Sequence, residues 1–391
     1  MENLALLAQI AFIIMLTPII SRVSRLPVSV VEILFGSLAA YFIFIDSSNE
    51  LFKNLSKIGF LYLMFLAGLE IDIKKFLKSR DMLLKKALIY FGMLYSLSFL
   101  IYSIFDLNPI YLVALPIVSL GMIMAMINEH GKEHQWLELA LVIGILGELI
   151  SIVAIVIYDG ALTFGLGFEF YKTIFYLVSV LVMAVILYRL LKVLFWWYPE
   201  LKLLIMPDND ARFQSVRFSI AIFFVMISIM YFLELDMVLG AFIAGLFISN
   251  FFEHQKELPH ALSTLGFGFL VPMFFIYVGS TLDLEVIFTY DIFINSLWIM
   301  VAMVVIRQIS SFVAYHSRLG TKATILFGLG DSMPLTFLIA IATIGYQAEA
   351  ITQNEYFSFV VASLLEGIII MTIVKIILNY KQKDSLNYEV R

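Results

Sequence analysis

Long apolar runs recur along the whole chain, and they constrain its fold more than any other feature. The thirteen runs occupy residues 4–20, 27–46, 55–70, 86–105, 109–127, 137–158, 170–195, 213–233, 236–251, 264–281, 290–315, 322–345 and 355–378. Helices that cross a bilayer need about 17–25 apolar residues. Hydrophobic residues make up 62% of the chain and charged residues 14%, against about 45–50% and about 25% in soluble domains. The sequence therefore predicts an all-α polytopic membrane protein with about thirteen transmembrane helices.

The lysines and arginines between the runs predict the orientation, because cytoplasmic loops are enriched in both residue types. With the N-terminus outside, the cytoplasmic side receives Arg22, Arg25, Lys74, Lys75, Lys78, Arg80, Lys85, Lys86, Lys192, Lys202, Arg212, Arg217, Arg318, Lys322, Lys381 and Lys383. The outer loops then hold only Lys53, Lys57 and Lys172. We expect a multi-pass protein of the cell (inner) membrane, with its N-terminus outside and its C-terminus in the cytoplasm.

Several classes of function are excluded by residue types and motifs that the sequence lacks. There is no cysteine, so disulfides and thiolate metal sites do not arise. No basic run indicates a nucleic-acid partner. No metal-ligand cluster, nucleotide-binding loop or nucleophile constellation is present. We therefore expect neither enzymatic activity nor a bound cofactor.

Glu148 lies where a charge is costly, near the middle of the run at 137–158. A carboxylate at the centre of a membrane helix costs roughly 2.5–3.5 kcal/mol on insertion scales, and such groups usually mark ion or proton pathways. Apolar surroundings favour the neutral acid over the carboxylate. A carboxyl group that can hold either a proton or a cation at this depth is suited to exchanging one for the other.

The thirteen runs divide into six, one linker and six, which indicates an inverted repeat. In the third and tenth runs, Gly68-Leu-Glu-Ile-Asp72 corresponds to Gly279-Ser-Thr-Leu-Asp283 on the opposite face of the membrane. Inverted repeats of this kind are common in secondary transporters. The predicted parts are a first six-helix repeat at 1–158, a linker helix and cytoplasmic loop at 159–212, a second six-helix repeat at 213–380 and a short tail at 381–391.

Two repeat-equivalent runs carry helix-breaking residues. The fifth run contains Pro116 and Gly121; the twelfth contains Gly328, Gly330, Asp331 and Pro334. Proline removes a backbone donor and glycine weakens a helix. Ordinary kinks packed against neighbouring helices would explain either run alone. A pair of broken helices at equivalent positions, however, is typical of a transport site.

Several ordered segments resemble the monovalent cation:proton antiporters, most closely their Kef-like and NapA-like branch. These segments are LPVSVVEILFG at 26–36, FLAGLEID at 65–72, MINEHG at 126–131, LGAFIAGLFIS at 239–249 and VPMFFIYVGSTLDL at 271–284. The resemblance implies an NhaA-like antiporter fold and a homodimer of thirteen-helix protomers. It further implies that each protomer has a dimerisation domain and a core domain with two crossed, discontinuous helices, and that the core moves like an elevator.

The chain departs from this family's pattern at its site. Where the family has two adjacent acids, Asn-Asp or Gln-Asp, this chain has Gly147 followed by Glu148. Where the family has a Ser-Thr pair in the first broken helix, this chain has Ser119 followed by Leu120. The resemblance also places Arg307 at the basic position in the helix before the second broken one. The departures predict a site with a single acid.

Glu148 is the predicted cation or proton site, and two hydroxyls are its candidate partners. Ser151 lies three residues further on and so on the same helical face, and Ser119 belongs to the first broken run. Hard cations prefer such oxygen ligands, although helix hydroxyls often bond only their own backbone. Arg307 keeps its proton, so we expect it to neutralise a carboxylate or the C-terminal end of a half-helix.

Three further acids within the apolar runs have supporting roles in this prediction. Asp331 is expected to balance charge at the second break through backbone N–H groups of the following half-helix, and a direct role as a cation ligand is the alternative. Glu366 occupies the repeat position equivalent to Glu148, and we expect a structural role with Lys375 or a helix end as its partner. Glu32 lies near the cytoplasmic end of its run and is a candidate for the inner vestibule.

One titratable acid at the site predicts the exchange of one proton for one Na⁺ or K⁺, without net charge movement. Beyond these ions, the expected partners are the lipid bilayer, a second copy of the chain and, if present, a separate regulatory subunit. An alternative is a sensor or assembly subunit built on the antiporter fold, with Glu148 permanently paired to Arg307. A third reading is a channel-like or organic-anion carrier in which Arg307 attracts the anion.

Overall fold

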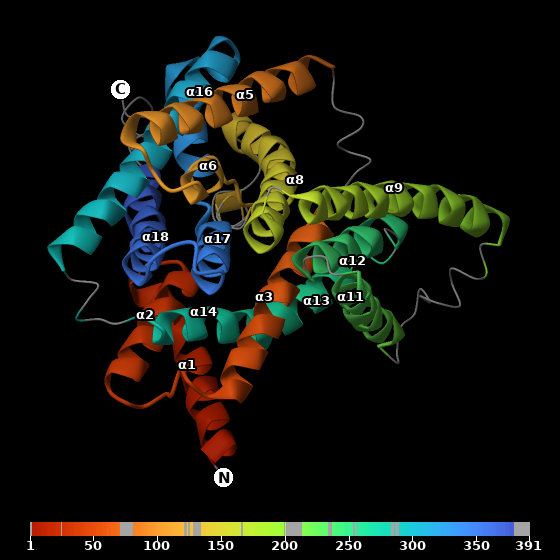
Figure 1. The fold of residues 1–391 in the computed structure, drawn as a ribbon, viewed down its shortest axis with the longest axis horizontal. Helices are drawn as coiled ribbons and strands as arrows, with labels where there is room; N and C mark the ends of the chain where they lie inside the picture. The colour runs from red at the N-terminus through yellow and green to blue at the C-terminus, as the bar shows by residue number, and fades with distance from the viewer. Residues whose placement is uncertain are drawn as a thin grey trace, which may run out of the picture. The chain divides into compact units, whose positions relative to one another are not determined.

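The computed structural model describes most of the chain. The described residues are 2–24, 26–70, 81–120, 123, 126–127, 134–165, 167–198, 200, 213–233, 237–252, 255, 257–282, 285 and 289–378. Every regular element in these ranges is helical (Figure 1). Among the described residues, seven helices are long and apolar enough to cross a membrane. The predicted all-helical membrane fold is therefore confirmed, whereas the count of thirteen crossings stays a prediction.

The chain forms two compact units, each built from both halves of the sequence. Unit 1 comprises Met1–Lys78 and Asp159–Leu284, and unit 2 comprises Ser79–Tyr158 and Glu285–Arg391. The expected boundaries at 158 and 213 separate two repeats of the sequence, whereas the two units are defined by contacts in space. The repeat boundaries therefore stay a prediction. Asp72 and Asp283, which helped to suggest the repeat, lie outside the described residues.

Unit 1 contains the first three helices and those that follow the middle of the chain. They are α1 Glu2–Ser24, α2 Val28–Tyr41, α3 Glu50–Glu70, α9 Phe168–Trp197, α11 Gln214–Phe232, α12 Met237–Phe251, α13 Leu258–Leu265, the π-helical turn η1 Gly266–Leu270 and α14 Val271–Ser280. Within it, α2 packs against α14, and α3 packs against both α12 and α14 (Figure 1). Apolar side chains of α1, α2, α3 and α14 share one core, which includes Ile10, Phe52 and Ile276.

Four glycines allow two helix pairs of unit 1 to approach backbone to backbone. Gly36 of α2 faces the carbonyl of Ile276 in α14, and Gly279 faces the carbonyl of Ile33 in return. The α3–α12 pair repeats this arrangement, with Gly68 against the Phe242 carbonyl and Gly245 against the Phe65 carbonyl. A Cβ on any of the four would overlap that carbonyl oxygen. Small residues at such contacts are a common basis of helix packing in membranes.

Substitution of Gly245 by alanine is expected to destabilise unit 1, because the new methyl group would overlap the Phe65 carbonyl. Overpacking of this kind typically costs about 1–3 kcal/mol. Gly92 of α5 is the matched control, since a Cβ there meets nothing within 4 Å. In thermal unfolding in detergent, the melting temperature of Gly245→Ala should be lower than that of wild type. The melting temperature of Gly92→Ala should not be lowered. Equal melting temperatures would contradict the close packing of α3 and α12.

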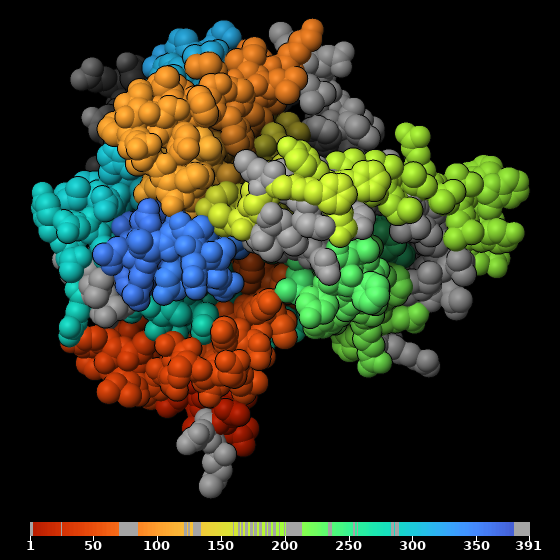
Figure 2. Space-filling view, in the orientation of Figure 1, coloured from red at the N-terminus to blue at the C-terminus, as the bar shows by residue number. Residues whose placement is uncertain are grey.

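Unit 2 contains the remaining helices. They are α5 Asp81–Phe105, α6 Ile110–Ala114, α8 Gln135–Phe164 up to Tyr158, α16 Tyr290–Asp331, α17 Leu335–Gln347, α18 Gln353–Leu365 and the π-helical turn η2 Glu366–Ile370, after which the helix continues to Leu378. The α16 range holds two helices, because Gly320 has a left-handed φ of 74° at the kink between them. This kink falls between the predicted runs at 290–315 and 322–345. Side chains of α17 and α18 pack together into one continuous surface (blue in Figure 2).

Both predicted helix interruptions are present in unit 2. After α6 ends at Ala114, the backbone is non-helical from Leu115 to Leu120, around Pro116. The second interruption spans Ser332–Pro334, between the end of α16 and the start of α17. Each break therefore exposes backbone carbonyls and N–H groups that no helix satisfies, and these groups need other partners.

Candidate functional site

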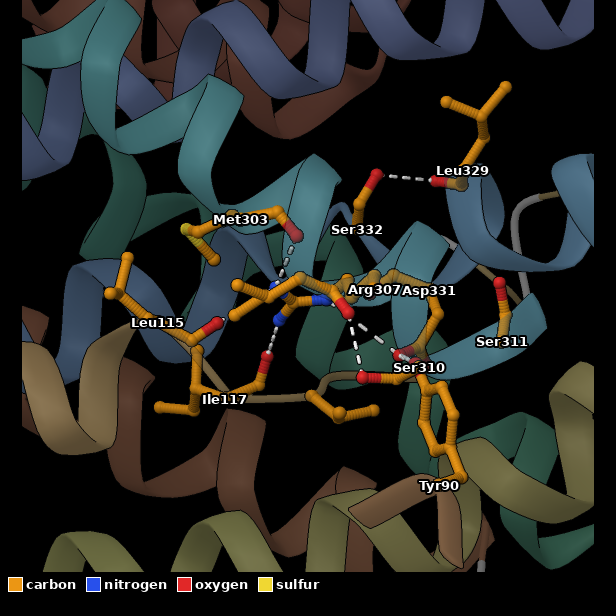
Figure 3. A network of polar contacts seen from close by, with 12 residues as sticks. Tyr90, Leu115, Ile117, Met303, Arg307, Ser310, Ser311, Leu329, Asp331 and Ser332 are labelled. Atoms are coloured by element: carbon orange, nitrogen blue, oxygen red, sulfur yellow. Dashed lines mark hydrogen bonds and ion pairs between the residues drawn. The ribbon is translucent and has the colours of Figure 1, made fainter. Parts of the chain in front are cut away.

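Arg307 of α16 satisfies carbonyls at both breaks. Its Nη1 donates to the Leu115 carbonyl at 2.8 Å, and its Nη2 donates to the Ile117 carbonyl. Its Nε donates to the Asp331 carbonyl at 3.0 Å, where α16 ends. A further bond from Nη1 to Met303, at 3.1 Å, stays within α16. Figure 3 shows the guanidinium between the two segments, with its side chain completely buried.

These contacts place a permanent positive charge at the ends of two half-helices. The carbonyls at the C-terminal end of a helix carry a partial negative charge. Leu115 and Ile117 follow α6, and Asp331 closes α16, so Arg307 compensates both ends at once. The sequence predicted this kind of role for Arg307, but it did not show that one side chain reaches both breaks.

Asp331 adds a buried carboxylate to the same network. Its Oδ2 lies 3.7 Å from Arg307 Nε and accepts a hydrogen bond from the Tyr90 hydroxyl of α5 (Figure 3). The rings of Tyr315 and Phe327 pack against Tyr90. Among the described contacts, no side chain caps the start of α17. Asp331 Oδ2 thus contacts Arg307 and Tyr90, and its predicted role toward the N–H groups of the following half-helix stays a prediction.

Glu148 lies in α8 and is only 3% exposed. The residue before it explains why it is the one acid at this point of the helix. A Cβ on Gly147 would lie 2.7 Å from Val118 in the first break, and one on Gly144 would lie 2.8 Å from Leu120. Close packing of α8 against the first break therefore leaves no space at 147 for the second acid of the family pattern.

Ser151 and Ser119 each have a hydrogen-bond partner in or directly after one of the two helix breaks. The N–H of Val118 donates to Ser151 Oγ at 2.8 Å, so this hydroxyl satisfies a backbone donor freed by the break. Ser119 Oγ lies 2.7 Å from Thr336 Oγ1 of α17. Sequence reasoning missed Thr336. The signal that could have pointed to it is a hydroxyl two residues after the break-forming Pro334.

The described contacts of Arg307 do not include Glu148. An arginine has five N–H donors, and the four carbonyls of Leu115, Ile117, Met303 and Asp331 receive four hydrogen bonds from Arg307. These bonds use four of the five donors, and the reading in which Arg307 is permanently paired with Glu148 stays a prediction.

Glu366 and Glu32 lie apart from these contacts. Glu366, in η2, is fully buried, and its carboxyl oxygens accept no hydrogen bond from the described residues. Its predicted structural role, with Lys375 or a helix end as its partner, stays a prediction. Glu32 is buried in α2 and belongs to unit 1. Its predicted vestibule role stays a prediction.

A helical membrane fold whose broken helices meet at buried charged groups defines the class of multi-pass membrane transporters. The model of the family described as "Sodium/hydrogen exchanger, transmembrane" matches residues 10–380. The chain belongs to this family of transporters, which are not enzymes.

Individual relatives agree with this assignment. YjbQ of Bacillus subtilis is 22% identical over 94% of this chain, and the chain spans 62% of its length. A Na⁺/H⁺ antiporter of Enterococcus hirae is 26% identical over 84% of this chain and 85% of its own. The sodium proton antiporter MjNhaP1 of Methanocaldococcus jannaschii has the same fold, with a TM-score of 0.68 over 96% of this chain and 97% of its own, at 13% identity.

Proposed function

We propose that the chain is an electroneutral antiporter that exchanges a monovalent cation, Na⁺ or K⁺, for a proton. The observation that carries the proposal is the buried carboxyl group of Glu148 in α8, directly after Gly147, which packs against Val118 of the first helix break. Ser151, one helical turn away, already contacts the backbone of that break. Carboxylate, hydroxyl and carbonyl oxygens are the ligands that hard cations prefer. Names of relatives such as the Enterococcus hirae Na⁺/H⁺ antiporter support the same activity.

The proposed cycle uses Glu148 for both ions in turn. The protonated acid releases its proton to one side, the carboxylate binds the cation together with Ser151 and Ser119, and the loaded site then opens to the other side. Arg307 and Asp331 balance charge at the breaks but do not carry ions, because Arg307 keeps its proton. Since Gly147 has no space for a second acid, one cation exchanges for one proton.

The proposed architecture has thirteen helices in two inverted repeats with crossed broken helices. Equivalent spacing supports the repeats. The same number of residues separates Pro116 from Glu148 and Pro334 from Glu366. The two helix pairs that approach through glycines support the repeats as well. In the proposed repeat α2 corresponds to α12 and α14 corresponds to α3, so the α2–α14 pair is equivalent to the α12–α3 pair.

The two compact units support an elevator mechanism. Unit 2 holds both breaks, Arg307 and Glu148, so it is the part that would carry the site across the membrane. Unit 1 would then form the fixed dimerisation domain of a homodimer, with the N-terminus outside and the C-terminus in the cytoplasm. A separate regulatory subunit can complete the assembly.

Exchange by the purified chain in liposomes tests this function. The liposomes are prepared with an acidic interior, and a pH-sensitive dye reports the internal pH. Addition of external Na⁺ or K⁺ should drive protons out of the liposomes, and protein-free liposomes should show no response. Clamping the membrane potential with valinomycin and K⁺ should leave the Na⁺-driven rate unchanged, because no net charge moves. If neither cation moved protons in any condition, the proposed function would be wrong.

A further inference from the structure

The two broken segments are joined by a direct contact between side-chain hydroxyls. Ser119 Oγ of the first break and Thr336 Oγ1 of α17 lie 2.7 Å apart. Hydroxyls within helices usually bond the carbonyl one turn earlier. Thr343, in the same helix, follows that rule and donates to the Ile339 carbonyl at 2.8 Å. The hydroxyl of Thr336 instead reaches a different segment of the chain.

This hydroxyl pair is linked through the backbone to Ser151, one of the oxygens proposed to bind the cation. Ser119 directly follows Val118, whose N–H is bonded to Ser151 at 2.8 Å. Ser151 and Glu148 share one face of α8. The family's threonine after this serine is replaced by Leu120, which is buried against Gly144 and offers no oxygen. Thr336 supplies a threonine hydroxyl at the same serine, but from the second broken helix.

We propose that Thr336 is a ligand of the transported cation and takes the place of the threonine that is missing after Ser119. The inference rests on the proposed antiport function and extends it to the second broken helix. Oxygens bound to a cation the size of Ca²⁺ or Na⁺, at about 2.3–2.6 Å, lie roughly 3.3–3.7 Å from one another. The Ser119–Thr336 contact of 2.7 Å is shorter, so the cation replaces a hydrogen bond and moves the two hydroxyls apart.

Such a ligand makes the cation a bridge between the two broken segments. Glu148, Ser119 and Ser151 all belong to the first half of the chain, whereas Thr336 belongs to the second. A smaller cation needs a smaller separation of the hydroxyls, so this pair favours Na⁺ over K⁺. The cation site is therefore completed by both broken helices.

Two substitutions at Thr336 distinguish a cation ligand from a side chain that only packs. The KM for Na⁺ and the maximal rate of exchange are measured for the full chain in liposomes. Thr336→Val keeps the shape and removes the hydroxyl, whereas Thr336→Ser keeps the hydroxyl. A lost contact to a charged group is expected to raise the KM for Na⁺ about tenfold, with the maximal rate changed much less. Thr336→Ser should stay close to wild type. Thr343→Val, which removes a hydroxyl bonded within its own helix, is the matched control and should not change KM.

A binding measurement tests the ligand without transport. In detergent, the melting temperature of the wild type should be higher in NaCl than in choline chloride, and Thr336→Ser and Thr343→Val should show the same increase. For Thr336→Val the increase should be much smaller. A wild-type KM and a wild-type Na⁺ response in Thr336→Val would overturn the inference, as would an equal loss in Thr336→Ser. If Thr336→Val did not fold, Thr336→Ala would take its place. Absence of exchange in wild type would instead count against the proposed function.

Discussion

Glu148→Gln is expected to reduce cation-driven proton movement to the level of protein-free liposomes, while the protein stays folded. Glutamine has nearly the shape of glutamic acid, so the packing of this 3% exposed side chain is kept. Its amide neither releases a proton nor offers a negative charge to a cation, so neither half of the cycle can occur. Dye-reported proton efflux after Na⁺ addition measures the loss, and the melting temperature in detergent checks the fold.

Glu366→Gln provides the matched control for this prediction. Glu366 is buried like Glu148 and lies at the position equivalent to Glu148 in the proposed repeat, but its carboxyl oxygens accept no hydrogen bond from the described residues. We expect it to retain exchange. Wild-type exchange in Glu148→Gln would show that the carboxyl group of Glu148 does not carry the ions.

The second large effect is expected from Arg307→Ala, which should destabilise unit 2. Removal of one partner of a buried ion pair typically costs about 3–5 kcal/mol, because the other charge is left buried alone. Here Asp331 is that charge, and the carbonyls of Leu115 and Ile117 lose their donor as well. The substitution should lower both the melting temperature and the yield of monodisperse protein. Arg307→Lys should lose less, since it keeps the charge but not the planar arrangement of donors.

A double substitution identifies the cause of this destabilisation. In Arg307→Ala with Asp331→Asn no unpaired charge stays buried, so part of the lost stability should return. The recovered part measures the coupling between the two side chains. If Arg307→Ala melted like wild type, or if the second substitution only added to the loss, the account of Arg307 as the residue that stabilises both breaks would be wrong.

The membrane fold could be predicted from the sequence because its signals are local. Apolar length predicts spanning helices, and Pro116 and Pro334 interrupt them where the structure does. Glu148 and Arg307 were recognisable because charged side chains are rare in such segments. The kink at Gly320 could be anticipated only as a gap between two runs, since a positive φ is not visible in hydropathy.

The contacts of the site could not be predicted, because they join residues that are distant in sequence. Arg307 reaches the carbonyls of Leu115 and Ile117 across some 190 positions, and a backbone carbonyl has no sequence signature. Tyr90 and Thr336 are unremarkable in sequence, and the hydrogen bonds to Asp331 and Ser119 give them their roles. Gly147 was noted as a missing acid, but its packing against Val118 required the fold.

A null-point measurement determines whether one cation exchanges for one proton at Glu148. In liposomes that contain the wild-type chain, the inside-to-outside ratios of Na⁺ and H⁺ are set independently, and the membrane potential is clamped at several values. Because each charge moved would contribute about 2.3 kcal/mol per 100 mV, net charge movement would shift the null point. We predict no net flux when the two ratios are equal, at every potential, and no flux at any ratio in Glu148→Gln. Flux at equal ratios that reverses with the potential would show that net charge moves and that the exchange is not one for one.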